Sequence, residues 1–322
     1  MIKIGVIGAG HMGRNHLRVL NDLNNEFELV GFTDKLESNI EFAKEAYKIK
    51  YYENVEDLLK DVEAVVIAAP SSLHKELGLM AAKNKVHALI EKPIALSEQD
   101  GKMLCEEFEK NGVNLIVGHV ERYNPVVAEL KKIIDNEKVI AIEAKRCSPF
   151  DPRISDTNVI YDLMIHDIDI VFNYLNTNGI EDIASKAVNV KSNNRADYVQ
   201  ATVQHENGTI SSLVASRVTE DKVRTIDVHT EKCFIRADLL NKTLTVSRKT
   251  TFDLNVGYVP TYKQENIIEK IMIPNIEPLK AEHVEFAKSI NEKRIPLTSG
   301  KDATKAVEIA EKINNTQLKI LK

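Results

Sequence analysis

The first 120 residues alternate between short apolar runs and stretches in which apolar residues recur at helical spacing. The runs are rich in Val, Ile and Ala, as expected of strands buried on both faces of a sheet. Helical spacing is clear between them, for example at Leu17, Leu20 and Leu23. The alternation predicts a parallel sheet covered by helices on both faces, over residues 1–120. The expected strands lie at 2–7, 27–33, 64–68, 86–90 and 114–117.

The pattern changes from residue 121 onwards, where apolar positions alternate in strands that follow one another without helices between them. Val199, Ala201 and Val203 share one face of such a strand, and Asn207-Gly208 is typical of a hairpin turn. Helices are expected at 125–135, 159–175, 278–291 and 300–315, and strands at 139–146, 224–228, 234–237 and 244–246. Residues 121–322 are therefore predicted to form an α+β domain with a largely antiparallel sheet.

Length and charge narrow the class of protein. A chain of 322 residues is long for one hydrophobic core, which favours two domains. The net charge is −5 and neither half is basic, so nucleic acid is not an expected partner. No apolar run approaches the roughly 18 residues that cross a bilayer, and the short apolar stretch at 2–7 is not typical of a signal peptide. No membrane partner is expected.

The three cysteines, Cys105, Cys147 and Cys233, are far apart and have no Cys-x-x-Cys spacing. This pattern indicates neither a disulfide framework nor a zinc site, and it favours a reducing cytoplasm.

Residues 8–13 read Gly-Ala-Gly-His-Met-Gly, directly after the first expected strand and at the start of the first expected helix. The glycines permit a tight turn, close approach of a pyrophosphate and close packing of helix on strand, while the helix N-terminus attracts the anion. Asp34 ends the second strand, where a carboxylate accepts hydrogen bonds from a ribose and repels a 2′-phosphate. NAD is therefore favoured, although Lys35 leaves NADP open. The expected cofactor contacts here are Gly8, Gly10, His11, Met12, Gly13 and Asp34.

Two further loops follow strands and so emerge at the carboxyl edge of the sheet, where ligands bind in this architecture. One carries Ser71 and His74, and the other reads Glu91-Lys92-Pro93. A rigidly held, partly desolvated Lys92 can hydrogen-bond a substrate hydroxyl and stabilise the alkoxide that precedes hydride loss. The alternative is an exposed loop lysine paired with Glu91.

A second polar cluster lies in the expected helix at 159–175. Asp162 and His166 are four residues apart, on one helix face, so the carboxylate can orient the imidazole as a general base needs. A satisfied core histidine is an equal alternative. Metal binding by Asp162, His166 and Asp169 ranks lower, because no further ligands have the required spacing, and no metal is expected.

These motifs, in this order along the chain, resemble the glucose–fructose oxidoreductase / inositol dehydrogenase / rhizopine-catabolism (Gfo/Idh/MocA) family of NAD(P)-dependent dehydrogenases. The resemblance implies a Rossmann domain and a second domain with an open sheet, often used for contacts in dimers or tetramers. It implies substrates that are sugars, sugar nucleotides or cyclitols. Carried over by position, it suggests Lys92, Asp162 and His166 as catalytic. It places Glu91 and Pro93 at the nicotinamide, with His74 near the cofactor.

Residues 118–125, Gly-His-Val-Glu-Arg-Tyr-Asn-Pro, resemble the domain junction of family members that act on UDP-N-acetylglucosamine at C3. Arg122 and Tyr123 are therefore candidate substrate contacts, and so is Arg153, which follows Asp151-Pro152 on a loop just before the expected helix at 159–175. Arginines suit a phosphate, a carboxylate or sugar hydroxyls. Ion pairs within the protein are an equal alternative for both arginines.

The leading hypothesis is an enzyme that transfers a hydride between a secondary hydroxyl and the nicotinamide, with His166 as base and Lys92 stabilising the alkoxide. Lys92 as the proton acceptor is an alternative that the sequence leaves open. A non-catalytic nucleotide-sensing regulator with the same fold is the other class, although it gives no reason to keep Lys92, Asp162 and His166 together. The substrate and the oligomeric state stay open.

Overall fold

A computed structural model describes residues 1–151, 157–175, 179–191, 195–256, 259–315 and 318–320. The chain divides into two compact units. The first contains residues 1–123 and 276–311, and the second contains residues 124–275 and 312–322. No helix among the described residues combines the length and the apolar character that a membrane span requires.

The first unit is built on a parallel sheet whose strand order is β3-β2-β1-β4-β5-β6. Strand β4 is buried at every position, as a central strand covered on both faces must be. The strands are β1 (Ile2–Ile7), β2 (Phe27–Thr33), β3 (Lys50–Tyr51), β4 (Ala64–Ile67), β5 (His87–Ile90) and β6 (Leu115–Val117). The helices between them are α1 (His11–Asp22), α2 (Glu37–Tyr47), α3 (Val55–Asp61), α4 (His74–Lys83) and α5 (Glu98–Asn111). This strand order is that of the dinucleotide-binding Rossmann fold, so the predicted class is confirmed.

Two helices from the end of the chain complete this first unit. Helix α8 (Pro278–Asn291) buries Leu279 and Phe286 in the same core cluster as Leu17 and Phe27. Most of α9 (Gly300–Asn314) also belongs to this unit. The apolar face of α8, which comes late in the sequence, is thus buried with residues of the first helix and first strands. The two compact units therefore do not coincide with the expected domains, residues 1–120 and 121–322. That division into domains stays a prediction.

The second unit contains a mixed sheet in the order β14-β13-β12-β11-β7-β10-β9-β8-β15. The pairs β7–β10 and β8–β15 are parallel, and the other pairs between described strands are antiparallel, which confirms the largely antiparallel sheet. The central strands are β7 (Val139–Cys147), β8 (Ile180–Asn189), β9 (Tyr198–His205), β10 (Ile210–Ser216) and β11 (Val223–Thr230). The others are β12 (Cys233–Asp238), β13 (Thr243–Val256), β14 (Val259–Ile271) and β15 (Leu318–Ile320).

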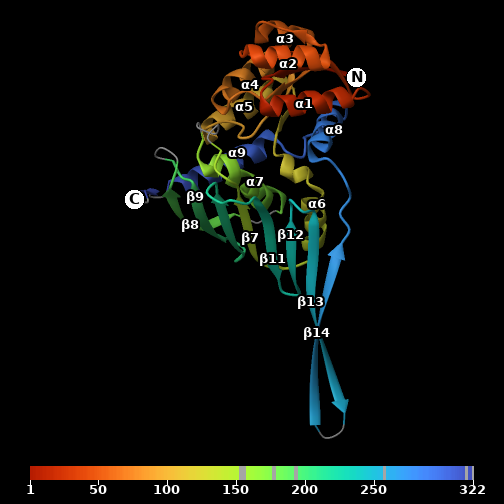
Figure 1. Cartoon of the computed structure of the whole chain (residues 1–322), viewed down its shortest axis with the longest axis vertical. Helices are drawn as coiled ribbons and strands as arrows, with labels where there is room; N and C mark the ends of the chain where they lie inside the picture. The colour runs from red at the N-terminus through yellow and green to blue at the C-terminus, as the bar shows by residue number, and fades with distance from the viewer. Residues whose placement is uncertain (152–156, 176–178, 192–194, 257–258, 316–317, 321–322) are drawn as a thin grey trace. The chain divides into compact units, whose positions relative to one another are not determined.

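A long hairpin ends this sheet. Strand β12 pairs with Thr243–Arg248, whereas the rest of β13 pairs with β14 alone. In Figure 1 the two strands continue well past the other strands of the second unit. The strand expected at 244–246 was therefore too short. Strand β14 was missed because its polar sequence has little of the alternation that marks a half-buried strand.

Helical segments of the second unit agree with the expected ones. Helix α6 (Pro125–Ile134) begins after Asn124, whose side chain accepts a hydrogen bond from the N–H of Val126. The helix expected at 159–175 is a continuous segment in which α7 (Ile165–Ile168) lies between two π-helical stretches, η3 (Ile160–Met164) and η4 (Asp169–Tyr174). Such wide turns are frequent at functional sites.

Because Phe286 is fully buried in the core of the first unit, Phe286→Ala is expected to lower the free energy of unfolding by about 3–5 kcal/mol. Leu36→Ala is the control, since Leu36 is 63% exposed. Urea denaturation of both variants measures the difference. A Phe286→Ala protein as stable as the control would contradict the placement of α8 in this core.

Candidate functional site

The Gly-rich loop between β1 and α1 has the backbone geometry that only glycine allows. Gly8 has φ +92°, and a Cβ there would lie 2.7 Å from the carbonyl oxygen of Ala68. A Cβ on Gly13 would lie 1.9 Å from the carbonyl oxygen of Gly8. Gly10 differs, because a Cβ there would meet no atom within 4 Å. Two glycines therefore let strand, loop and helix pack, and the third leaves open space at the N-terminus of α1.

That open space would let a phosphate group approach the backbone of the loop. Gly10 is the N-cap of α1 and supplies no side-chain oxygen to the amides of the first turn. Those amides and the helix dipole are then available to a pyrophosphate. The residues of the loop that are expected to hold NAD thus have the space and the donors the cofactor requires.

Asp34, at the end of β2, is joined to this loop. Its Oδ2 accepts a hydrogen bond of 2.6 Å from the N–H of Ala9, and its Oδ1 accepts one of 2.8 Å from the N–H of Leu36. Asn39 donates to the same carboxylate and accepts a hydrogen bond from Arg14, whose guanidinium lies 3.9 Å from the centre of the Phe42 ring. The Asn39 side chain therefore connects a carboxylate and a cation where the adenosine ribose is expected.

The two loops at the carboxyl edge of the sheet are connected by His74. Its Nδ1 lies 2.7 Å from the carbonyl oxygen of Pro93 and its Nε2 lies 2.9 Å from that of Ala69. The ring is 1% exposed, and burial lowers its pKa despite these two contacts. His74 thus holds the loops together, and its expected proximity to the cofactor stays a prediction. Ser71 lies in the first of these loops, in the short turn η1 (Ser71–Leu73), and is partly exposed.

Glu91 is buried at the end of β5, and both of its carboxylate oxygens accept hydrogen bonds. Oε1 receives one of 2.9 Å from Nε2 of His16, and Oε2 receives one of 3.1 Å from the backbone N–H of Lys92. Burial raises the pKa of Glu91, but the His16 hydrogen bond and the charges of His16 and Lys92 outweigh it, so the pKa is below its ordinary value. The carboxylate is therefore ionised. The side chain of Lys92, which follows it, is half-buried.

The second unit carries the other catalytic candidates. Asp162 lies in η3 and His166 in α7, and both are half-buried. The adjacent Asp167 forms a buried ion pair with Arg146, whose Nη2 lies 2.8 Å from its Oδ1. This ion pair, which the sequence pattern did not indicate, holds α7 against β7. The convergence of His166 with Lys92 stays a prediction.

The residues expected to contact substrate from the junction have partners inside the first unit. Arg122 is 3% exposed, and its Nη1 lies 2.7 Å from the carbonyl oxygen of Leu297 and 3.1 Å from Oδ2 of Asp302. The hydroxyl of Tyr123 lies 3.1 Å from Oγ1 of Thr298. These contacts favour the alternative of an ion pair within the protein for Arg122. Arg153 lies outside the described residues.

Three buried polar residues of the first unit were not anticipated. His16 on α1 and His283 on α8 are in contact, with Nδ1 of the first 2.9 Å from Nε2 of the second. Glu282, also on α8, is fully buried, and neither of its carboxyl oxygens has a hydrogen-bond partner among the described residues. Burial and the charge of Glu91 raise its pKa well above the ordinary 4.5. A polar residue on the apolar face that carries Leu17 and Leu20 was the available signal for His16.

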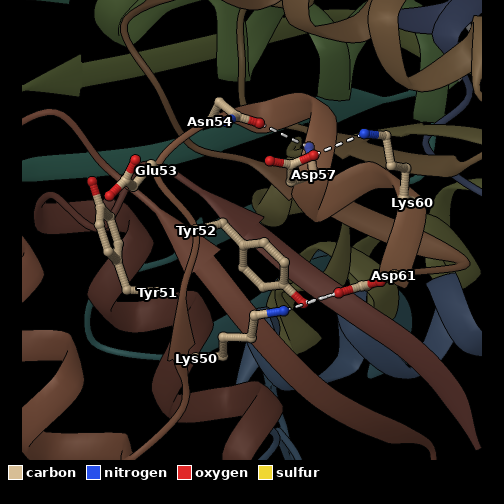
Figure 2. A pocket seen from close by; sticks show the side chains of 8 residues that line it. All are labelled: Lys50, Tyr51, Tyr52, Glu53, Asn54, Asp57, Lys60 and Asp61. Atoms are coloured by element: carbon tan, nitrogen blue, oxygen red, sulfur yellow. Dashed lines mark hydrogen bonds and ion pairs between the residues drawn. The ribbon is translucent and has the colours of Figure 1, made fainter.

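A pocket of about 430 Å³ lies elsewhere in the first unit, between β3 and α3 (Figure 2). Both lysines of its wall are paired with carboxylates of the wall, Lys50 with Asp61 at 3.2 Å and Lys60 with Asp57 at 2.8 Å. None of the expected site residues lines it. Across the part of the chain that the structure describes, no three His, Cys, Asp or Glu side chains gather as a metal ion would need.

The strand order and the Gly-rich loop define a dinucleotide-binding protein with a Rossmann domain. Residues 2–119 match the family described as "Oxidoreductase family, NAD-binding Rossmann fold", and residues 129–236 match "GFO/IDH/MocA C-terminal domain". The chain belongs to this GFO/IDH/MocA family. The resemblance, the NAD cofactor and the expected class of enzyme, a dehydrogenase that acts on CH–OH groups, are thereby confirmed.

Several relatives have named activities. UDP-N-acetylglucosamine 3-dehydrogenase of Acidithiobacillus ferrooxidans is 34% identical over 245 residues, 76% of each chain. A solved structure of that enzyme has a TM-score of 0.87 and 28% identity, and covers 97% of this chain and 96% of its own. Glucose-6-phosphate 3-dehydrogenase of Bacillus subtilis is 27% identical over 278 residues, 82% of this chain and 77% of the relative. A levoglucosan dehydrogenase in complex with NADH, 18% identical with a TM-score of 0.81 over 97% of this chain and 96% of its own, shares the fold.

Asp34→Ala is expected to relax the preference for NAD over NADP by about 10- to 100-fold, because a carboxylate that faces a 2′-phosphate repels it, here by about 1.4–2.8 kcal/mol. The ratio of kcat/KM for the two cofactors measures it. Adding Arg14→Ala is the control, since it removes the nearby cation and should cancel the gain in NADP use. An unchanged ratio in Asp34→Ala would contradict the assignment of this carboxylate.

Glu282→Gln is expected to stabilise the protein at pH 7 and to do so much less near pH 4. The folded pKa of Glu282 is raised, so the carboxyl binds its proton more tightly in the folded state. The resulting contribution of Glu282 to the free energy of unfolding is fully present below the pKa of the unfolded state, near 4.5. It is lost as the pH rises through the raised pKa of the folded state. Glutamine has no proton to lose. Urea midpoints of the parent and variant at both pH values measure the effect, and an equal difference at both would contradict it.

Proposed function

We propose that this chain is a dehydrogenase of UDP-N-acetylglucosamine or a closely similar sugar nucleotide, oxidising the secondary hydroxyl at C3. The substrate class is supported by the similarity to an enzyme of that name. The two chains are 34% identical over 76% of each. Glucose 6-phosphate and inositols are the substrates that other named relatives suggest. All of them present a ring of secondary hydroxyls.

The cofactor's place follows from the first unit. Gly8, Gly10 and Gly13 would hold the pyrophosphate at the start of α1, and Asp34 would accept the ribose hydroxyls. NAD, when bound, supplies the acceptor for the hydride. Ser71, His74 and Pro93 line or brace the carboxyl edge of the sheet, where the nicotinamide is expected.

Lys92 is proposed to donate a hydrogen bond to the substrate oxygen and to stabilise the charge that develops as the hydroxyl loses its proton. The ionised Glu91 behind it supports this role, because its negative charge lies next to the residue that carries the ammonium. His166 is proposed as the base, oriented by Asp162. Lys92 as the proton acceptor remains the alternative, with His166 as an orienting donor.

Three further expectations concern the oligomeric state, the location and the alternative function. A homo-oligomer, a dimer or tetramer, and a cytoplasmic location stay predictions. A nucleotide-sensing regulator is the alternative function. The buried Glu91 that accepts the backbone N–H of Lys92 supports the enzyme, since a regulator does not need a lysine held on this loop.

Turnover is tested by following the absorbance of the reduced nicotinamide with NAD and a panel of UDP-N-acetylglucosamine, UDP-glucose, glucose 6-phosphate and inositols. The highest kcat/KM is expected with UDP-N-acetylglucosamine. Lys92→Ala should lower kcat about 10²- to 10⁴-fold, as for the loss of a group that assists proton transfer.

Lys102→Ala is the matched control, because Lys102 is an exposed lysine of α5 paired with Glu98. It should leave turnover within about twofold, as most surface substitutions do. Binding of NADH without turnover of any substrate would favour the regulator. A higher kcat/KM with an inositol would overturn the substrate class and keep the enzyme.

A further inference from the structure

A continuous line of buried polar side chains in the first unit ends at the backbone of Lys92. It starts at His283 on α8, passes through His16 on α1 and reaches Glu91 at the end of β5. His16 and His283 are each 0% exposed. Neither histidine has a part in the function proposed above.

Each residue of this line contacts the next through a polar atom. Nδ1 of His16 meets Nε2 of His283 at 2.9 Å, with the two rings nearly perpendicular at 83°. Nε2 of His16 donates to Oε1 of Glu91 at 2.9 Å. Oε2 of Glu91 then accepts the N–H of Lys92 at 3.1 Å. Each ring nitrogen of His16 is therefore occupied, and the two oxygens of Glu91 face in different directions, one to His16 and one to Lys92.

Glu91 has little freedom to take another position. A Cβ on Gly118 would lie 3.0 Å from both Cδ and Oε2 of Glu91, so the adjacent backbone closes one side of the carboxylate. A buried carboxylate without hydrogen-bond donors is strongly unfavourable, and His16 supplies the side-chain donor. The position of the Glu91 carboxylate therefore depends on His16.

We propose that His16 is a positioning residue for Lys92: it holds the Glu91 carboxylate, which in turn holds the backbone N–H from which the Lys92 side chain begins. This inference rests on the proposed function, in which Lys92 faces the reacting hydroxyl. His283 orients the ring of His16, as the outer partner of a catalytic imidazole does. A residue that merely fills the core affects folding, cofactor binding and turnover alike, whereas a positioning residue affects turnover most.

His16→Asn and His16→Gln form a matched pair. The amide of Asn reaches only as far as Nδ1 of the histidine, whereas the amide of Gln reaches the place of Nε2 and can still donate to Glu91. His16→Asn is expected to lower kcat about 100-fold, as a displacement of about 1 Å at a reacting group does. The dissociation constant of NADH, from its fluorescence, should change less than about threefold, because the Gly-rich loop keeps its contacts. His16→Gln should recover most of kcat.

His87→Asn is the control outside the line. His87 is a partly buried histidine of the same sheet, whose Nδ1 accepts the N–H of Asn114 and does not contact Glu91. Its kcat is expected to match that of the parent. Equal kcat values for His16→Asn and His16→Gln, or a parallel loss of NADH binding and kcat, would overturn the proposal.

Hydrogen exchange separates this inference from the proposed function, since it needs no turnover. The amide of Lys92 is followed by NMR of the ¹⁵N-labelled protein, in which this amide gives a signal of its own. Exchange of this amide should rise about tenfold in His16→Asn, reflecting one weakened charge-assisted hydrogen bond, and stay near the parent in His16→Gln. Unchanged exchange in His16→Asn would overturn the positioning role even in an active enzyme. A parent without turnover but with this exchange pattern would overturn the proposed function alone.

His283→Asn keeps the test decisive if the His16 variants do not fold. It removes the outer contact to His16 and leaves the contact between His16 and Glu91 in place. The Lys92 amide is expected to exchange faster in His283→Asn than in His87→Asn. Equal exchange in the two variants would contradict the proposed line of contacts.

Discussion

The buried carboxylate of Glu91 is the constraint around which the first unit is arranged. A negative charge at the end of a central strand is tolerated only when donors surround it. Here the donors are a ring nitrogen from α1 and the next backbone N–H, and the ring is held in turn from α8. The same helix α8 adds Phe286 to the apolar core. The dinucleotide-binding unit is therefore not finished by the first 120 residues, since the chain returns after residue 275 to complete both its core and its polar interior.

Much of the fold could be predicted because the deciding forces are local or periodic. The bounds of β1, β2 and α8 agree with the apolar pattern, and the hairpin between β9 and β10 turns at Gly208, with φ +84°. The Gly-rich loop was equally readable, since Gly8 and Gly13 are demanded by backbone geometry within a few residues. Where hydrophobic alternation is weak the prediction failed, as in β14 and most of β13, whose pairing is set by the hairpin itself.

The polar interior could not be predicted in the same way. His16 and His283 are 267 positions apart, and no spacing rule connects them. The motif that suggested Arg122 as a substrate contact, which stays a prediction, gave no sign that its guanidinium contacts Leu297 and Asp302. Those contacts depend on how the end of the chain packs. Motifs identify residues that matter, whereas the partner of a charged side chain is decided by tertiary packing.

Two carboxyl groups in one buried region show how that packing distributes charge. Glu91 has two donors and is ionised, whereas Glu282 has none among the described residues, and its pKa is raised by burial and by the charge of Glu91. Like charges close together in a low dielectric cannot both form easily, which is why the charge of Glu91 raises the pKa of Glu282. The allocation of N–H groups thus favours a negative charge on Glu91, beside Lys92, over one on Glu282 of α8. If the donors lay beside Glu282 and not beside Glu91, ionisation of Glu282 would be the more favourable of the two. The hydrogen bond between His16 and Glu91 therefore matters for the chemistry proposed at Lys92.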